Sequence, residues 1–322
     1  MKVIITDHQF EHADRERSIV ETAGFEMIEV QCKTEEDLID RVADADALIV
    51  QWAPITANVI AVLSNCKVIV RYGIGVDNID LEAAKEKGIP VCNIPDYCID
   101  EVADHVMALA LAGGRQLKQT EERFKAGTWK IVPPHPMNTF RKMVFATAGY
   151  GRIAREVLKR AAGFKFQLAA YDPYVDEDEM KVNGVKKLTI EELFDKADIL
   201  SLNLPLTDET GHFVNAERLK QMKSTAILVN TARGGLVDTA ALANALHNNE
   251  IAFAGLDVFE EEPLDMDHSL WKCDNAILTS HISWYSEGSV PKLQELAAEA
   301  AVKALKGEAL NNQVNQDEDH SV

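Results

Sequence analysis

The stretch MVFATAGYGRIAREVLKRAAGFKFQLAAYD, residues 143–172, decides the fold of this chain. An apolar run at 144–148 leads into a glycine turn and an amphipathic helical pattern, and a second apolar run at 168–171 ends in Asp172. Strand, glycine turn, helix, strand and acid, in this order, are typical of a dinucleotide-binding βαβ unit. We therefore expect a parallel sheet that is built around residues 144–148.

Each position of the glycine turn has a physical reason. Gly149 lets the chain turn tightly out of the strand, and Gly151 lets the backbone approach a pyrophosphate because it has no Cβ. Ala154, at the third position, is still small enough for the helix to pack closely on the strand. The free N–H groups and the positive dipole end of the helix then face the phosphates.

Asp172 favours NAD over NADP. It lies about 20 residues after the turn, where an acid that binds the ribose hydroxyls is expected. A 2′-phosphate would be repelled by this carboxylate, and the next residues, Pro173 and Tyr174, provide no arginine to neutralise it. A six-residue glycine pattern alone is weak evidence, so the prediction depends on the flanking strands, the helix and Asp172 together.

Composition limits the possible partners. The chain has 322 residues, 47% hydrophobic and 26% charged, which predicts about two globular domains. Its net charge of −19 argues against nucleic acid and anionic membranes as partners, because both require a basic surface. A small anionic substrate needs only a local basic pocket and stays possible.

The cysteines and the apolar runs predict a soluble cytoplasmic protein. The 5 cysteines are an odd number without a C-x-x-C pair, which indicates free thiols in a reducing compartment. No apolar run approaches the length of a membrane span, and the N-terminus enters a strand pattern directly. No His or Cys pair has metal-ligand spacing, so we expect no metal site.

The rest of the chain alternates between strands and helices, which predicts two doubly wound parallel α/β domains. The first comprises residues 1–100 and 288–322, and the second, residues 101–287, carries the glycine turn in a six-stranded sheet. We expect one long helix over 100–117, an irregular segment over 118–142 and a disordered tail over 311–322. The expected strands lie at 3–6, 27–30, 47–51, 68–72, 90–93, 198–204, 226–231, 252–259 and 276–280, and the expected helices at 34–43, 81–87, 190–196, 216–222, 239–248 and 290–306.

Three chemical groups follow the later strands. Arg233 comes after 226–231, three glutamates at 260–262 come after 252–259, and His281 comes after 276–280 with Trp284 nearby. Ligands of an open α/β sheet bind beyond the carboxyl ends of its strands, so these groups meet at the edge where the cofactor binds.

This set of groups fits hydride transfer to a 2-oxo acid. An imidazolium would donate the proton to the developing alkoxide, and a carboxylate that hydrogen-bonds to it would favour its charged form and fix its orientation. A guanidinium would bind the substrate carboxylate. The sequence pattern alone leaves open which of the three glutamates is the partner of His281. It also leaves open that Arg233 is an ordinary turn residue and that Trp284 belongs to the hydrophobic core.

Several stretches in the same order resemble the D-isomer-specific 2-hydroxyacid dehydrogenases over nearly the whole chain. They are VRYGIGVDNIDLEAAKEKGIPVCNIP (70–95), GYGRIA with AYDPY, LSLNLPLTDETGHFVN (200–215), LVNTARGGLVD (228–238), LDVFEEEPL (256–264) and LTSHISWYS (278–286). The resemblance implies a flavodoxin-like substrate domain and a Rossmann NAD-binding domain with a cleft between them, a 2-hydroxy or 2-oxo acid as substrate, and a homodimer.

The resemblance also implies roles for individual residues. It assigns catalysis to Arg233, Glu262 and His281, and so selects Glu262 from its neighbours. It assigns the substrate carboxylate to backbone groups of Ile74 and Gly75. The residues that it assigns to the cofactor are Gly149, Tyr150, Gly151, Arg152, Ile153, Asp172, Leu204, Pro205, Thr210, Thr231, Ala232 and Asp257.

Within the family, HISWYSEGS and Arg71 look most like the branch that contains the C-terminal-binding proteins, in which Arg71 and Trp284 would line the substrate pocket. That branch makes an alternative function possible, an NADH-gated binding or corepressor-like protein with little turnover. A formate dehydrogenase of the same fold is disfavoured, because that branch has Gln as the partner of the histidine.

Overall fold

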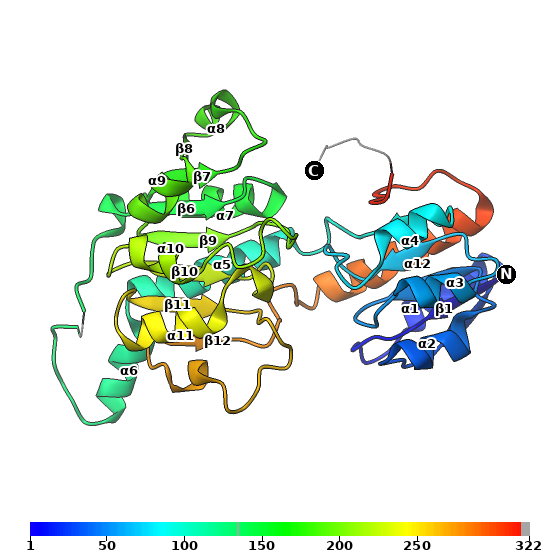
Figure 1. Ribbon diagram of the computed structural model, residues 1–322, viewed down its shortest axis with the longest axis horizontal. Helices are drawn as coiled ribbons and strands as arrows, with labels where there is room; N and C mark the ends of the chain where they lie inside the picture. Colours follow the sequence, from blue (N-terminus) through cyan, green and yellow to red (C-terminus); the bar gives the residue numbers. More distant parts are fainter. Residues whose placement is uncertain (134, 317–322) are drawn as a thin grey trace. The chain divides into compact units, whose positions relative to one another are not determined.

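The computed structural model describes residues 1–133 and 135–316, and the chain divides into two compact units (Figure 1). The first unit contains Met1–Cys98 and the chain from Tyr285 onward, and the second contains Ile99–Trp284. Each has its own parallel sheet with helices on both faces, so the predicted pair of α/β domains is confirmed. Within the described residues, no helix is long and apolar enough to cross a membrane.

The first unit has a five-stranded parallel sheet in the order β2-β1-β3-β4-β5. This 2-1-3-4-5 order is the flavodoxin-like doubly wound arrangement. The central strand β3 is buried at all its positions, as expected for a strand covered on both faces. The strands are β1 (Lys2–Ile5), β2 (Glu26–Glu29), β3 (Ala47–Val50), β4 (Ile69–Arg71) and β5 (Val91–Cys92), and the helices are α1 (Asp14–Thr22), α2 (Glu35–Val42), α3 (Ala57–Val62), α4 (Leu81–Glu86) and α12 (Ser289–Lys306).

The predicted disorder of the tail is wrong for the residues up to 316, because they cover the edge strand β5. The Val314 amide donates to the Val91 carbonyl at 2.8 Å, and the Asn315 side chain accepts from the Val91 amide at 2.9 Å. Asn315 also donates to the Ile89 carbonyl at 2.9 Å. Buried backbone groups of an edge strand need partners, and this segment supplies them. The remaining predicted tail, 317–322, lies outside the described residues.

The second unit has a seven-stranded parallel sheet in the order β12-β11-β10-β9-β6-β7-β8. The prediction of six strands is wrong because β8, a two-residue strand of two lysines, has no apolar pattern that would reveal it. The strands are β6 (Val144–Ala148), β7 (Gln167–Tyr171), β8 (Lys186–Lys187), β9 (Ile199–Leu202), β10 (Ile227–Asn230), β11 (Phe253–Leu256) and β12 (Ala276–Leu278). The chain reverses its winding between β6 and β9, which makes their carboxyl ends the topological switch point.

The helix expected at 100–117 is shorter and is followed by another helix. Gln116 adopts a left-handed φ of 49° and ends the run, and its side chain bonds to backbone groups of the segment at 135–136. A new helix, α6, then occupies part of the segment predicted to be irregular. The helices of this unit are α5 (Ile99–Gly114), α6 (Leu117–Lys125), α7 (Arg152–Gly163), α8 (Glu177–Val182), α9 (Ile190–Lys196), α10 (Ala216–Gln221) and α11 (Thr239–His247).

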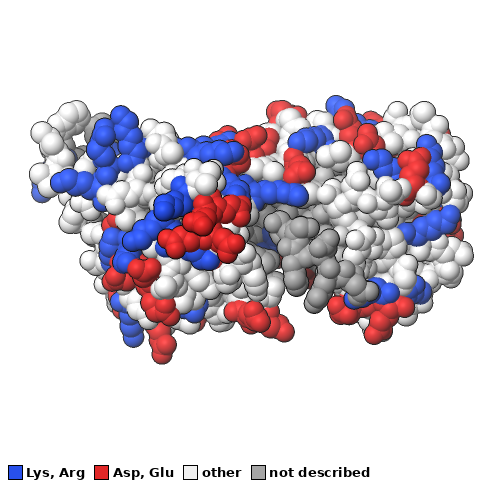
Figure 2. All heavy atoms as spheres, turned by 90° about the horizontal axis from the view of Figure 1, so that it is seen from above, with Lys and Arg blue, Asp and Glu red and all other residues white. Residues whose placement is uncertain are grey.

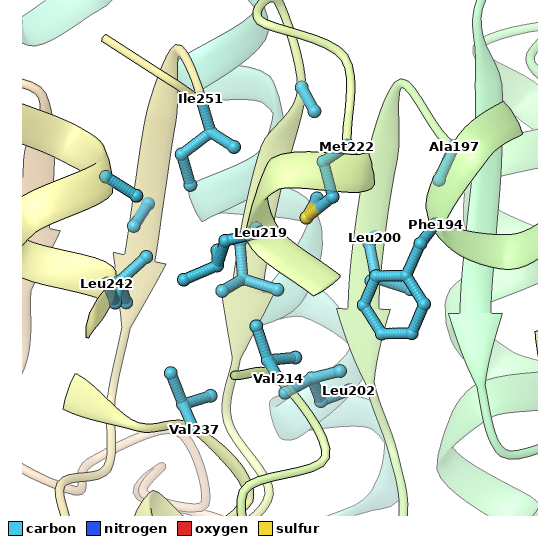
Figure 3. Close-up of a cluster of buried hydrophobic side chains, with 14 of the residues drawn as sticks. Phe194, Ala197, Leu200, Leu202, Val214, Leu219, Met222, Val237, Leu242 and Ile251 are labelled. Carbon is cyan, nitrogen blue, oxygen red and sulfur yellow. The ribbon is translucent and has the colours of Figure 1, made fainter. Parts of the chain in front are cut away.

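Apolar clusters on both faces of the second sheet fix the strands. Alternate residues of β6 point to opposite faces, so Ala146 joins one cluster and Phe145 the other. Figure 3 shows the first cluster, in which Phe194 of α9, Leu219 of α10 and Leu242 of α11 pack onto the strands. Acidic and basic side chains are interspersed over the face of the molecule in Figure 2.

Candidate active site

The turn after β6 can be made only by glycine at its first position. Gly149 has a φ of +95°, and a Cβ there would lie 2.5 Å from the Asn203 carbonyl oxygen. The Gly149 amide donates to the Tyr171 carbonyl at 2.7 Å, which continues the β6–β7 ladder into the turn. The turn is therefore packed against the end of β9 on one side and β7 on the other.

Gly151, unlike Gly149, is bordered by open space that a ligand could occupy. It caps the N-terminus of α7 with an ordinary φ of −74°, and a Cβ at this position would meet nothing within 4 Å. The space in front of the helix terminus is thus open, and Arg152 and Ile153 begin the helix behind it. The N-terminal end of a 12-residue helix, with open space before it, is suited to bind a pyrophosphate.

Asp172 lies beside this turn. Its carboxylate accepts from the Tyr150 amide at 2.9 Å and from the Tyr174 amide at 2.9 Å, one bond on each oxygen. Each oxygen keeps a free acceptor position, as a carboxylate that binds ribose hydroxyls requires. Arg155, which no sequence motif singles out, stacks over the Tyr150 ring at 4.2 Å and pairs with Glu179 at 2.5 Å.

The other residues predicted to bind the cofactor lie in loops after β9 and β10. Thr210 donates to the Pro205 carbonyl at 2.7 Å and so closes the loop that begins with Leu204. Thr231 directly follows β10, and its buried hydroxyl oxygen has no hydrogen-bond partner among the described residues. A buried hydroxyl without a partner is costly, so a bound ligand with a polar group would satisfy it. These loops, together with Gly151 and Asp172, fit a dinucleotide.

The structure brings two of the three predicted catalytic residues into contact. The Nδ1 atom of His281 lies 2.7 Å from a carboxylate oxygen of Glu262. The other oxygen of Glu262 accepts from the Phe259 amide at 3.0 Å, which fixes the carboxyl group in place. Both side chains stay partly accessible, with 23% of His281 and 33% of Glu262 exposed. The pair is thus ordered from within the chain and still open to a substrate.

The three consecutive glutamates have three different surroundings. Glu260 accepts from the Thr239 amide at 2.9 Å, from the Thr239 hydroxyl and from His212 Nε2 at 2.6 Å. Burial alone would raise the pKa of Glu260, but these hydrogen bonds outweigh it and lower the pKa. Glu261 is exposed and makes no hydrogen bond or ion pair within the described residues. Among the three, the contact with His281 belongs to Glu262.

The turn that carries His281 is held by Asp257, which is fully buried. The carboxylate accepts from the Ile282 amide at 3.0 Å and the Ser283 amide at 2.8 Å, and the Asp257 carbonyl accepts from the His281 amide at 2.8 Å. His281 has a φ of +55°, an uncommon conformation for a residue with a side chain. The Trp284 indole donates to the His281 carbonyl at 2.8 Å and closes the turn. The predicted contact of Asp257 with the cofactor stays a prediction.

Arg233 is positioned by a residue that no sequence pattern singles out. Asn230, the buried last residue of β10, donates to the Arg233 carbonyl at 2.8 Å and accepts from the Ala232 amide at 3.1 Å. A Cβ on Gly234 would lie 1.8 Å from the Phe259 carbonyl carbon, so the Arg233 loop packs directly on the segment that leads to Glu262. The only feature of the sequence that could have indicated a role for Asn230 is its position at the end of a buried strand.

The predicted substrate residues of the first unit lie at the end of β4 and in the loop that follows it. Arg71 is only 8% exposed, and its guanidinium lies over the Trp52 ring at 5.5 Å. A Cβ on Gly73, which has a φ of +141°, would lie 1.5 Å from Arg71 Nη1, so only glycine leaves room for this arrangement. The Asn93 side chain donates to the Ile74 carbonyl at 2.7 Å and holds the loop that continues to Gly75.

Comparison with known proteins identifies the family. The family model for the D-isomer specific 2-hydroxyacid dehydrogenase NAD binding domain matches residues 107–283. A glyoxylate reductase from Korarchaeum cryptofilum is 38% identical over 285 residues, which are 87% of this chain and 86% of that protein. The chain belongs to the D-isomer-specific 2-hydroxyacid dehydrogenase family.

Other members of the D-isomer-specific 2-hydroxyacid dehydrogenase family match most of the chain. A D-3-phosphoglycerate dehydrogenase from Methanocaldococcus jannaschii is 39% identical over 317 residues, 98% of this chain. The chain spans only 59% of the length of that relative. A D-lactate dehydrogenase from Aquifex aeolicus, solved with NAD and lactic acid, superposes with a TM-score of 0.86 at 27% identity, covering 95% of this chain and 96% of that one.

These findings confirm the predicted family and the NAD-binding domain, which lies in the second unit. The narrower resemblance to the branch of the C-terminal-binding proteins stays a prediction. The roles of the individual site residues also stay predictions, although the contacts around them are now defined.

Proposed function

We propose that this protein is an NAD-dependent oxidoreductase that interconverts a D-2-hydroxy acid and the corresponding 2-oxo acid. The observation that carries the proposal is the 2.7 Å contact between His281 Nδ1 and Glu262, in a unit that matches an NAD-binding domain. An imidazole oriented by a carboxylate is suited to exchange a proton with a hydroxyl group.

The pair His281–Glu262 would move the proton. Because Nδ1 is engaged by Glu262, the exchange with the substrate oxygen falls to Nε2 of His281. During reduction the imidazolium donates this proton to the oxygen on C2, and during oxidation the neutral ring accepts the hydroxyl proton. The Glu262 carboxylate favours the charged ring and keeps it in one orientation.

Cationic and backbone groups would bind the substrate. Arg233 would hold the substrate carboxylate through its planar fork and stabilise charge on the carbonyl oxygen. The other proposed substrate contacts are Arg71, backbone groups of Ile74 and Gly75, and Trp284, whose indole favours a bulky or apolar substrate side chain.

Bound NAD would supply or receive the hydride. The open space at Gly151 and the N-terminus of α7 would accept its pyrophosphate, and the Asp172 carboxylate would accept hydrogen bonds from ribose hydroxyls. The unsatisfied Thr231 hydroxyl supports a ligand at the end of β10. The remaining predicted contacts come from Tyr150, Arg152, Ile153, Leu204, Pro205, Thr210, Ala232 and Asp257.

We further propose a homodimer, and we keep the cytoplasmic location as an expectation from composition. Support for the dimer comes from large apolar side chains that follow α6 and face solvent in the single chain. Trp129 is 83% exposed, Ile131 96% and Val132 75%. Such a run is typical of a surface that is covered by another chain.

A turnover panel with a catalytic variant tests the activity. NADH oxidation is measured with glyoxylate, pyruvate, hydroxypyruvate, its phosphate ester, and branched and aromatic 2-oxo acids. We expect His281→Ala to lower kcat by roughly 10²–10⁴-fold while NADH binding, followed by fluorescence, is unchanged. Absence of turnover in the wild type with every oxo acid, despite NADH binding, would overturn the proposal and favour a binding protein.

A further inference from the structure

A second histidine lies behind the His281 turn and has no part in the mechanism above. His105, on α5, places Nε2 3.1 Å from the Thr279 hydroxyl oxygen and 3.8 Å from a carboxylate oxygen of Asp257. Its side chain is 22% exposed, so the ring is largely enclosed by the protein.

The hydrogen bonds in this group have a defined direction. Thr279 has one hydroxyl hydrogen, and its oxygen lies 2.5 Å from the Asp257 carboxylate, which can only accept. The hydrogen therefore points to Asp257, and a lone pair of the hydroxyl oxygen is left for His105. His105 must then carry a hydrogen on Nε2 and donate it to Thr279, so the chain of donors runs from His105 through Thr279 to Asp257.

The series of hydrogen bonds ends at Asp257, the residue that holds the turn carrying His281. Asp257 accepts from Thr279, Ile282 and Ser283 through its carboxylate and from the His281 amide through its carbonyl. These bonds hold His281 at a φ of +55°, which ordinary residues adopt at a cost. Loss of a donor to a buried carboxylate leaves a charged acceptor unsatisfied and loosens the groups that share it.

We propose that His105 is a positioning residue for His281, acting through Thr279 and Asp257. The inference rests on the proposed function, because it concerns the same proton-transfer residue. His105 touches neither substrate nor cofactor in this role. It orients the Thr279 hydroxyl, which completes the set of donors around Asp257, and Asp257 sets the backbone that presents the His281 ring to Glu262.

The test compares variants that remove or keep the donor. His105→Ala and Thr279→Val break the chain of hydrogen bonds at two points. His105→Gln keeps an N–H donor at the place of Nε2, and Thr279→Ser keeps the hydroxyl. We expect each breaking variant to lower kcat by about 10- to 100-fold, the effect of one hydrogen bond to a charged group. The double variant should be no slower than either single one, and the Gln and Ser variants should recover most of the rate.

A spectroscopic measurement separates this inference from the proposed function. The proton between His281 Nδ1 and Glu262 is followed by NMR in the wild type and in each variant, with exposed His247→Ala as the control. If the wild type shows no turnover, the proposed function fails. The positioning role is still supported in that case if the His281 signal shifts or broadens only in the breaking variants. An unchanged His281 signal in His105→Ala and Thr279→Val, or a Gln variant as slow as the Ala variant, would overturn the inference.

Discussion

The neighbouring glutamates at 260–262 differ in their contacts. Substitution of Glu262 can therefore be compared with the same substitution of Glu261. Glu262→Gln removes the charge opposite His281, so we expect kcat to fall by at least about tenfold. The largest expected loss is the full contribution of general acid–base catalysis to the rate. Glu261→Gln should stay within about twofold of the wild type, because surface substitutions without contacts have small effects. Steady-state kinetics with the best oxo acid checks both. Equal rates for the two variants would contradict the pairing of Glu262 with His281.

The proposed catalytic residues could be picked out from the sequence, whereas the residues that contact and hold them could not. Arg233 and His281 follow predicted strands, and the family resemblance singled out Glu262. His105 and Thr279 meet across 174 positions of the sequence, and no local pattern connects them. Asn230 likewise looks like an ordinary strand residue. Such partners are selected by the packing of elements, which periodicity and motif spacing do not contain.

The β6–α7 turn makes a prediction at the level of one element. Gly151→Ala places its Cβ in open space, so the unfolding temperature should hardly change. NADH affinity should fall by about tenfold or more, since the methyl group would enter the proposed phosphate site. Gly149→Ala instead meets the Asn203 carbonyl at a positive φ and should cost about 1–3 kcal/mol of stability. Thermal unfolding and fluorescence titration distinguish the two. A Gly151→Ala variant that binds NADH as the wild type does would contradict the assigned site.

Helix α1 contains a buried acid that makes stability depend on pH. Glu16 is fully buried and accepts from the Tyr72 hydroxyl at 2.7 Å and from Gln294 at 3.1 Å. Burial raises the pKa of Glu16, and these hydrogen bonds offset only part of the shift. The folded state therefore holds this proton to higher pH than the unfolded state, so the contribution of Glu16 to stability falls as pH rises above the ordinary carboxyl range.

A variant isolates this contribution. The stability of Glu16→Gln relative to the wild type should increase as pH rises through that window and then level off, since the amide has no proton to lose. Denaturant unfolding at several pH values measures it, with exposed Glu21→Gln on the same helix as the control. A constant difference between Glu16→Gln and the wild type at all pH values would argue against a buried carboxylate with a raised pKa.

Elements with strong periodicity were predicted well, and weak ones were not. The predicted helix over Ile190–Lys196 agrees with the structure at both ends, and it begins with a capping box at Thr189. Helix α6 was missed because its sequence, LKQTEERFK, is mainly polar and buries only Gln119. Strand β8 was missed because two lysines carry no pattern. Both lie at the periphery of the second unit, where little apolar burial marks the sequence.

At the scale of the whole molecule, the proposed dimer can be tested through the exposed run after α6. Trp129→Ser with Ile131→Ser removes apolar area that association would bury, so the wild type should have twice the chain mass and the variant should shift toward the monomer. Light scattering after size-exclusion chromatography measures the mass. Tyr174→Ser is the control, because Tyr174 is 89% exposed and lies outside this run. A monomeric wild type would contradict the proposal.

The contacts of Val314 and Asn315 with β5 have a consequence for solubility. A parallel sheet that ends in free amide and carbonyl groups can accept a strand from another copy, and repeated additions produce fibrils. Here the chain occupies that position with its own later residues, so a foreign strand finds no vacant groups along β5. Shortening the chain ahead of residue 312 would remove this protection, whereas a fusion joined after residue 316 would leave it intact.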